Sequence, residues 1–269
     1  MFKDWFGGGR ETPPRVAQAP EGTRLYAIGD IHGRLDLLRA LHTLIAEHGR
    51  NFKGTRKIIY LGDYIDRGLD SRGVVELLCT ERVNGFEPVY LRGNHDDWLL
   101  HFLQDSSRGL GWLRNGGDAT LFSYGVNSEM DRTLGDEPSD DRLRRAQAEL
   151  RDVLPDHHLR FFNELALYHE EGDYFFVHAG VRPGRALDDQ IADDLIWIRE
   201  EFLASRADFG KVVVHGHSIS NEPELLANRI GVDTGAYFSG ALTAMVLEGE
   251  SRELLQTGSG TDSLLAAGD

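Results

Sequence analysis

The chain has 269 residues, of which 41% are hydrophobic and 27% are charged, which is the composition of an ordinary globular protein. This length suits one large α/β domain or two small ones. With 44 acidic against 29 basic residues, the formal net charge is −15. Such a surface repels polyanions and disfavours nucleic acid or anionic membranes as partners, although bound metal ions can reverse the field inside one cleft.

The two ends of the chain differ in composition from the stretch between them. Residues 1–22 hold a triple glycine and several prolines and predict a flexible N-terminal segment, and residues 257–269 predict a flexible C-terminal tail. Residues 23–256 are therefore expected to form the folded domain. No run has the apolar length of a signal peptide or a membrane span, and Cys79, the single cysteine, can form no intramolecular disulfide. A cytoplasmic location is the expectation that follows.

Short runs rich in β-branched and aromatic residues predict buried strands, and each is followed by a turn that carries Asp, Asn or His. The runs cover residues 24–28, 57–61, 88–91, 174–177 and 212–214. The polar residues that follow them are Asp30 and His32, Asp63 and Asp66, Asn94 and His95, His178, and His217. Because ligands bind beyond the carboxyl ends of strands in open α/β sheets, we expect these side chains to converge in one crevice.

Other segments alternate with these runs. Apolar residues at helical spacing predict helices near residues 35–45 and 74–78. Residues from about 98 to 155, amphipathic and partly very charged, predict a cap-like insertion packed over the crevice. Residues 229–234 and 241–248 predict two later strands that complete a second sheet.

Taken singly, each motif has an ordinary structural explanation. Asp30 with His32 is typical of a turn cap beside a surface histidine, and Asp63 with Asp66 is typical of an Asx-turn. A lone histidine at a strand end is more often a hydrogen-bonded structural residue than a ligand, and we interpret His215 in that way.

Taken together, the motifs point to a metal site. They supply carboxylate, imidazole and amide donors without thiolate, a set that suits Mn, Fe or Zn. If two ions lie about 3.5–4 Å apart, one carboxylate has to bridge them, and Asp63 is the best candidate. The neutral amide of Asn94 leaves such a site with a net positive charge, which matches a phosphate dianion.

These motifs resemble those of the calcineurin-like metallophosphoesterase superfamily, specifically its phosphoprotein phosphatase branch with bacterial relatives. The resemblance rests on Gly29-Asp30-Ile31-His32-Gly33, Gly62-Asp63-Tyr64-Ile65-Asp66-Arg67-Gly68, Gly93-Asn94-His95-Asp96, His178-Ala179-Gly180 and Gly216-His217. It spans about residues 24–250 and implies an α/β sandwich of two mixed sheets flanked by helices. Asp96 stands where the protein phosphatases carry Glu, and Ser218-Ile219 leave out the second histidine of the diesterase branches.

The resemblance also implies a role for each site residue. One ion would be held by Asp30, His32 and Asp63, and the other by Asp63, Asn94, His178 and His217. His95 would be the general acid, oriented by Asp66, and Arg67 and Arg199 would bind phosphate oxygens. The two divalent ions are expected to be Mn²⁺, with Fe or Zn as alternatives.

The sequence therefore predicts hydrolysis of phosphate monoesters by a metal-activated hydroxide. Phosphoserine, phosphothreonine or phosphotyrosine in proteins is the first choice of substrate. The alternative enzyme is a symmetrical dinucleoside tetraphosphate hydrolase: an insertion that closes over a nucleoside favours it, and an open groove favours proteins. The full ligand set argues against a non-catalytic phosphate-binding module, and the net charge argues against a nuclease. The oligomeric state stays open.

Overall fold

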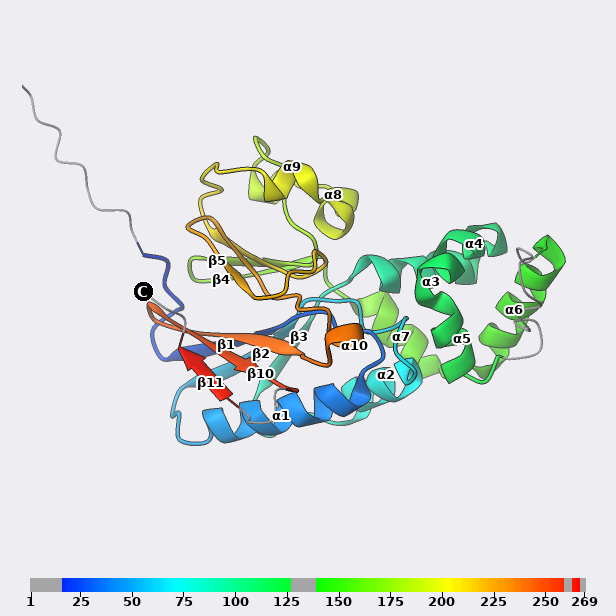
Figure 1. Cartoon of the computed structure of the whole chain (residues 1–269), viewed down its shortest axis with the longest axis horizontal. Coiled ribbons are helices and arrows are strands. Elements are labelled where there is room, and N and C mark those ends of the chain that lie inside the picture. The colour runs from blue at the N-terminus through cyan, green and yellow to red at the C-terminus, as the bar shows by residue number, and fades with distance from the viewer. Residues whose placement is uncertain (1–15, 127–138, 259–262, 267–269) are drawn as a thin grey trace, which may run out of the picture.

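The computed structural model describes residues 16–126, 139–258 and 263–266. Two mixed β-sheets lie one above the other, with helices on their outer sides and a helical lobe beyond one end (Figure 1). This is the two-sheet α/β architecture that the sequence predicts. None of the helices in the described ranges combines the length and the apolar character needed to cross a bilayer.

The first sheet contains six strands in the order β11-β10-β9-β1-β2-β3. Its strands are β1 (Thr23–Ile28), β2 (Thr55–Tyr60), β3 (Glu87–Tyr90), β9 (Thr243–Glu248), β10 (Ser251–Gln256) and β11 (Ser263–Ala266). Strands β1, β2 and β3 run parallel, and β9 pairs antiparallel with β1. The carboxyl ends of the three parallel strands therefore share one edge of the sheet.

The second sheet contains five strands in the order β4-β5-β6-β8-β7. Its strands are β4 (Tyr168–Glu171), β5 (Tyr174–Val177), β6 (Val212–His215), β7 (Glu224–Leu225) and β8 (Arg229–Gly231). Strands β5, β6 and β8 are parallel. Buried parallel strands read as continuous apolar runs, which is why Tyr174–Val177 and Val212–His215 show no polar alternation.

Helices cover the outer faces and form the lobe (Figure 1). Those beside the sheets are α1 (Leu35–Gly49), α2 (Ser71–Thr80), α8 (Ala192–Trp197), α9 (Glu200–Leu203) and α10 (Ala236–Ser239). Those of the lobe, between β3 and β4, are α3 (Asn94–Gln104), α4 (Gly109–Trp112), α5 (Asp118–Ser123), α6 (Asp140–Val153) and α7 (Asp156–Glu164). The cap-like insertion expected at about 98–155 corresponds to this lobe, which includes α3 and α7 at its two ends.

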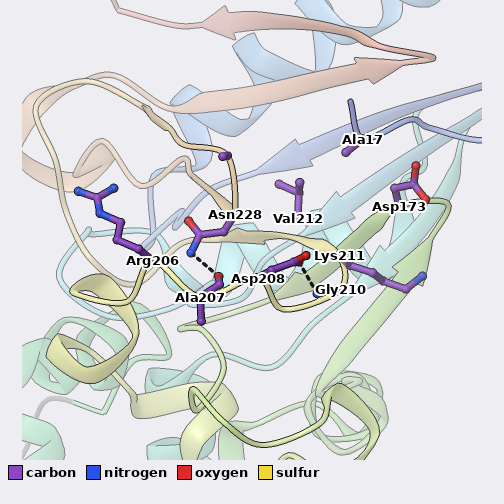
Figure 2. A pocket seen from close by; sticks show the side chains of 10 residues that line it. Ala17, Asp173, Arg206, Ala207, Asp208, Gly210, Lys211, Val212 and Asn228 are labelled. Atoms are coloured by element: carbon purple, nitrogen blue, oxygen red, sulfur yellow. Dashed lines mark hydrogen bonds between the residues drawn. The ribbon is translucent and has the colours of Figure 1, made fainter. Parts of the chain in front are cut away.

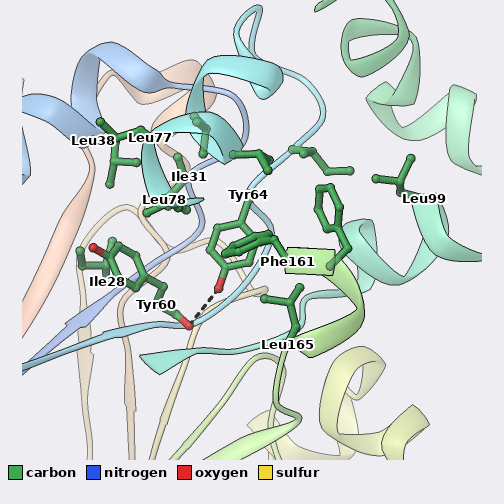
Figure 3. Close-up of a cluster of buried hydrophobic side chains, with 14 of the residues drawn as sticks. Ile28, Ile31, Leu38, Tyr60, Tyr64, Leu77, Leu78, Leu99, Phe161 and Leu165 are labelled. Carbon is green, nitrogen blue, oxygen red and sulfur yellow. Dashed lines mark hydrogen bonds between the residues drawn. The ribbon is translucent and has the colours of Figure 1, made fainter. Parts of the chain in front are cut away.

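Apolar side chains fill the space between the sheets and the space under the helices. Ile59 on β2, Val214 on β6 and Met245 on β9 belong to the layer between the sheets and are fully buried. A second cluster packs α1, α2 and α7 onto the first sheet; Leu38, Tyr60 and Phe161 are among its members (Figure 3). Within it the Tyr64 hydroxyl donates to the backbone oxygen of Leu91 at 2.8 Å. The loop after β2 is thereby anchored to the end of β3.

The structure differs from the sequence-based expectations at both ends of the domain. Residues 1–15 lie outside the described ranges, but residues 16–22, expected to be flexible, pack on the domain: Ala19 N–H donates to Gly249 O at 2.9 Å. In the expected tail, 263–266 form β11 and pair with β10. Thr257 is also buried, and it exchanges two hydrogen bonds with Leu242.

The later strands were predicted at nearly the right residues, but only one of the two lies in the predicted sheet. Arg229–Gly231 does lie in the second sheet, whereas Thr243–Glu248 crosses to the first sheet and pairs with β1. An apolar run reports that a strand is buried; it carries no information on which neighbour it pairs with.

Candidate metal centre

The predicted site residues meet where strands of the two sheets end. Asp63 and Asp66 follow β2, Asn94 and His95 begin α3 just after β3, and His217 follows β6. All five are buried. Close approach of these loops depends on glycine: a Cβ on Gly93 would lie 2.0 Å from Asp63 Oδ1, and one on Gly216 would lie 2.2 Å from Asp30 Oδ1.

Asp63 lies at the middle of the site, with its two oxygens turned to different histidines. Oδ2 is 3.5 Å from His32 Nε2 and 3.9 Å from His95 Nε2, and Oδ1 is 3.5 Å from His178 Nε2. Around Asp63, two groups of donor atoms in the described residues are close enough to hold an ion: His32, Asp63 and His95, and Asp63, His178 and His217. The first group contains His95, the predicted general acid, in place of the predicted ligand Asp30, whose Oδ2 lies 4.0 Å from His32 Nε2. Only Asp63 belongs to both groups, which is the arrangement that a bridging carboxylate requires.

Backbone carbonyls orient two of the histidines. The Nδ1 atom of His32 lies 2.8 Å from Ile65 O, and the Nδ1 atom of His178 lies 2.9 Å from Leu61 O. Each carbonyl accepts the Nδ1 proton, so that Nε2 keeps its lone pair and faces Asp63. This is the support that histidine ligands of metals usually have.

Asp30 and His217 come together across the two sheets. The His217 backbone N–H donates to both carboxylate oxygens of Asp30 at 3.1 Å. The Nε2 atom of His217 is buried and has no hydrogen-bond partner among the described residues. A buried imidazole nitrogen left unpaired is costly, and a bound cation would satisfy it. Asn94 Oδ1 lies 3.0 Å from His178 Nε2, so the amide oxygen that is predicted to bind metal faces the same site as the His178 ring.

Burial and the neighbouring charges set the protonation of these groups. Burial lowers the pKa of His32 to about 3 and that of His217 to about 2, so both rings are neutral and can act as donors. Burial alone would raise the pKa of Asp63, but the surrounding histidines, His178 first, hold it below its usual range. Burial, together with the charges of Asp233 and Asp63, raises the pKa of Asp30. A site with several buried carboxylates and neutral imidazoles is one that divalent cations stabilise.

His95 and Asp66 form a hydrogen-bonded pair beside the ligands. His95 Nδ1 donates to Asp66 Oδ2 at 2.6 Å. Two residues of the lobe support the same carboxylate: Trp112 Nε1 donates to Oδ2 at 2.7 Å, and Thr120 Oγ1 donates to Oδ1 at 2.6 Å. The position of the His95 ring is thus set by a carboxylate that itself has little freedom to move, and its Nε2 faces the centre.

The two predicted arginines have different surroundings. Arg67 lies over the centre, with Nη1 3.0 Å from His32 Nε2 and Nη2 3.1 Å from His95 Nε2. Arg199 Nη1 donates to the backbone oxygen of His217 at 3.1 Å. Arg67 therefore faces the candidate metal site directly, while Arg199 contacts the backbone of the loop that carries His217.

Three further residues contribute to the site that were given no role from the sequence. Asp233 is buried and its pKa is raised by burial to about 6, next to Asp30. Asp96 accepts from the backbone N–H groups of Gly93 and Asp63, both at 2.9 Å. Tyr237 packs its ring against His32 and under the Arg67 guanidinium, 4.8 Å from ring centroid to Cζ. Asp96 stood in one of the motifs that carry the resemblance, whereas Asp233 and Tyr237 stood in none of those five motifs.

His215, interpreted as structural, lies apart from these donors. Its ring packs edge-on against Phe202, with 5.0 Å between the centroids, and Nδ1 contacts the carbonyl oxygen of Gly216. Its Nε2, like that of His217, has no hydrogen-bond partner in the described part of the chain, but His215 belongs to neither group of donor atoms around Asp63.

Two pockets adjoin the centre on different sides. One, of about 580 Å³, is lined by Arg67, Leu69, Phe122 and Tyr237 among others. The other, of about 550 Å³, is lined by Trp98, Arg108 and Trp197 among others. Trp98 packs on His95 and Trp197 packs near His217, with centroid distances of 5.1 and 6.4 Å. Residues of the lobe line both pockets; the first also includes Arg67, and the second also includes Trp197 of α8.

A third pocket, of about 420 Å³, lies away from the centre (Figure 2). Its lining includes Val212, the first residue of β6, whereas His217 follows the other end of that strand. It is thus at the amino ends of the strands, where α/β sheets do not usually bind ligands.

Comparison with known proteins agrees with this geometry. The family model for calcineurin-like phosphoesterases matches residues 23–244. The bis(5'-nucleosyl)-tetraphosphatase PrpE [asymmetrical] of Bacillus thuringiensis (strain Al Hakam) is 25% identical over 242 residues, covering 81% of this chain and 88% of that protein. The protein of the same name from Anoxybacillus flavithermus is 26% identical over 234 residues, with the same coverage.

Solved structures share the fold at lower identity. A structure provisionally assigned as a diadenosine tetraphosphatase has a TM-score of 0.57 and 21% identity, and covers 90% of this chain and 100% of its own. A cold-active protein tyrosine phosphatase has a TM-score of 0.55 and 16% identity, and covers 89% of this chain and 79% of its own. The family model spans most of the chain, and two ligand groups share one carboxylate at the strand ends; the chain belongs to the calcineurin-like phosphoesterase family.

Proposed function

We propose that this protein hydrolyses phosphate monoesters at a centre of two divalent metal ions, and that its first class of substrate is a phosphorylated side chain of a protein. The observation that carries the proposal is the His95–Asp66 pair, at 2.6 Å, beside the carboxylate that both ligand groups share. An alkoxide is a poor leaving group, so cleavage of a phosphoserine or phosphothreonine ester gains most from a positioned general acid.

The residues present fit two metal ions. Asp30, His32 and Asp63 would hold one ion, and Asp63, Asn94, His178 and His217 would hold the other. Bound there, two divalent ions would supply Lewis acidity, which lowers the pKa of water and neutralises phosphate charge. Mn²⁺ is the first choice of metal, with Fe or Zn as alternatives.

The side chains around the centre would bind the phosphate, transfer the proton and hold the proton donor in position. Arg67 offers a planar pair of N–H donors to the phosphoryl oxygens, where negative charge accumulates in the transition state. With its Nδ1 proton held by Asp66, His95 presents Nε2 to the centre, where it carries the proton for the leaving oxygen. Trp112 and Thr120 keep Asp66 in place and so act on the reaction only through the His95 ring.

A second substrate class, a dinucleoside tetraphosphate, is favoured by a different observation. Two pockets near the centre each contain two aromatic side chains, Phe122 and Tyr237 in one and Trp98 and Trp197 in the other, as a substrate with a base at each end of a phosphate chain would need. The curated relatives described above carry the name of enzymes acting on such compounds. The leaving group there is a phosphate anion, which needs a general acid less than an alkoxide does.

The test uses the full chain, stripped with a chelator and reloaded with Mn²⁺. Phosphate release is measured from phosphoserine, phosphothreonine and phosphotyrosine peptides, and nucleotide products are measured from diadenosine tetraphosphate. Metal-dependent dephosphorylation of a peptide supports the first proposal. Cleavage of the dinucleotide alone moves the function to the second class, where ADP as sole product means symmetrical cleavage and AMP with ATP means asymmetrical cleavage. Inactivity on every substrate refutes both.

A variant pair separates the two substrate classes further. Phe122, 63% exposed, lines the pocket beside Arg67, whereas Phe238, 61% exposed, is not among the residues that line it. If a base stacks in this pocket, Phe122→Ala raises KM for the dinucleotide and leaves p-nitrophenyl phosphate unchanged. Phe238→Ala is the matched control. Equal effects of the two substitutions on KM would contradict binding of a base in this pocket.

A further inference from the structure

A second cluster of metal-binding side chains lies outside the dinuclear centre. Glu76 on α2 faces His157 and His158, the second and third residues of α7. Glu76 Oε2 is 3.0 Å from His157 Nε2 and 2.9 Å from His158 Nε2. The three donor atoms lie within 4.8 Å of one another, and none of these residues belongs to the catalytic centre.

The convergence of the two histidines is unusual for a helix. Consecutive residues of an α-helix project about 100° apart, so neighbouring side chains do not ordinarily face one partner. Here both rings direct Nε2 at the same carboxylate oxygen, with their centroids 4.5 Å apart and their planes at 72°. Four-coordinate zinc, with donors about 2.0–2.1 Å from the ion, places those donors roughly 3.3 Å apart. The two Glu76 distances are close to that spacing.

His158 also has the support that a metal-bound histidine needs. Its side chain is fully buried, and its Nδ1 lies 2.8 Å from the Tyr124 hydroxyl. The ring orientation is thus set on the Nδ1 side, and Nε2 is directed outward at Glu76.

The opposite edge of the cluster is open to solvent. Side-chain exposure is 47% for Glu76 and 44% for His157, so an ion can enter and water can complete its coordination. Two imidazoles and one carboxylate with open positions suit a divalent transition metal better than Ca²⁺ or Mg²⁺, which prefer sites made of oxygen alone.

We propose that Glu76, His157 and His158 bind a third divalent metal ion, with Zn²⁺ as the preferred metal, and that this ion joins α2 to α7. The proposal is independent of the substrate and of the reaction. Its structural consequence lies in α2, whose first residue, Ser71, accepts a hydrogen bond from the Asp66 backbone N–H at 3.1 Å. An ion on Glu76, five residues further along the same short helix, stabilises the element that supports Asp66.

The test counts metal ions on the full chain. Protein stripped with a chelator is dialysed against Zn²⁺ and the bound metal is measured by elemental analysis. The wild type is expected to hold one ion more per chain than Glu76→Gln and His157→Ala. His101→Ala is the matched control, because His101 is 43% exposed and pairs with Asp97 at 3.2 Å but belongs to no group of three possible metal ligands among the described residues.

A thermal melt provides the second readout. Zn²⁺ should raise the Tm of the wild type and of His101→Ala by more than it raises the Tm of either cluster variant. Equal zinc content in all four proteins overturns the proposal, and so does an equal rise in Tm. Because Glu76→Gln leaves the dinuclear ligands untouched, a loss of one ion in that variant reports on this cluster even if the dinuclear centre itself fails to load. Circular dichroism confirms that each variant is folded before its metal is counted.

Discussion

Replacement of His95 by Asn tests the general-acid role directly. Asn can occupy the space and form hydrogen bonds, but it cannot deliver a proton. The backbone N–H of His95 donates to Asp63 Oδ1 at 2.9 Å, and that contact is kept because it does not involve the side chain. The variant therefore removes the proposed general acid and keeps the backbone hydrogen bond to the Asp63 carboxylate.

The size of the effect depends on the leaving group. A positioned general acid contributes about 10²–10⁴-fold, or about 3–5 kcal/mol of transition-state stabilisation. On a phosphoserine peptide, whose leaving group is an alkoxide, we expect His95→Asn to lose most of this factor in kcat/KM. On p-nitrophenyl phosphate, whose phenolate leaves as a stable anion, we expect less than about a tenfold loss.

The assay compares the two substrates on the same Mn²⁺-loaded preparation, with metal content measured in parallel. Asp66→Asn is the companion variant: it keeps the ring but removes the carboxylate that sets its tautomer, so it should show the same dependence on leaving group. Equal losses of His95→Asn on both substrates, at unchanged metal content, would refute the general-acid role. They would instead indicate that His95 only shapes the centre.

Three other sets of substitutions test the hydrogen bond that supports Asp66, the bridging role of Asp63, and the loss of stability in acid. Trp112→Phe removes the donor at 2.7 Å from Asp66 Oδ2, and we expect a loss of about 1–3 kcal/mol in urea unfolding together with a fall in kcat that is larger for alkyl than for aryl esters. Asp63→Asn should reduce the occupancy of both ions, whereas His217→Asn should reduce that of one; elemental analysis distinguishes these results. Burial lowers the pKa of His42 to about 4, below the ~6.5 of an unfolded chain, so its contribution to stability is complete above that value and is lost as the pH falls toward 4. Between pH 7 and 5 the wild type should thus lose about 1–2 kcal/mol more than His42→Gln, which still offers an acceptor to the Tyr60 hydroxyl, and equal losses in the two proteins would contradict the assignment.

The sequence was most informative where one element determines both the fold and the site. A buried parallel strand is a continuous apolar run, and the residue after it lies at the edge where ligands bind. Asp63 could therefore be expected at the centre from its position after β2, and its role as the bridge is still a prediction. His32 and His178 followed from the same reasoning on β1 and β5. The ligand assignment itself remains a prediction until metal is measured.

Side chains that contact the site from the helices of the lobe could not be predicted, because they do not follow a strand of either sheet. Trp112 and Thr120 lie in helices of the lobe, 46 and 54 residues from Asp66, and no periodicity marks a helical residue as the partner of a distant carboxylate. Asp233 follows the short strand β8, and nothing in that local run marks its carboxylate as the neighbour of Asp30, which follows β1. The strand at Thr243–Glu248 shows the general limit, because hydrophobic patterning predicts burial but not which strand lies alongside.

The backbone at the centre shows why the motif residues have to act together. In the described residues, the non-glycine positions with positive φ are His32, Asp63, Asp66, Arg67 and His217, all of which were predicted site residues. A left-handed conformation costs an L-residue about 1–2 kcal/mol, so these five positions store strain on the order of the net stability of a domain. Such strain persists only where the surroundings over-determine the conformation. Asp96 supplies part of that constraint, because its carboxylate accepts from the N–H groups that lead into and out of the Asp63 turn. The short Asp96 side chain therefore acts on the metal ligands through the loop that carries Asp63, and the ligand geometry and the loop conformation are maintained by the same hydrogen bonds.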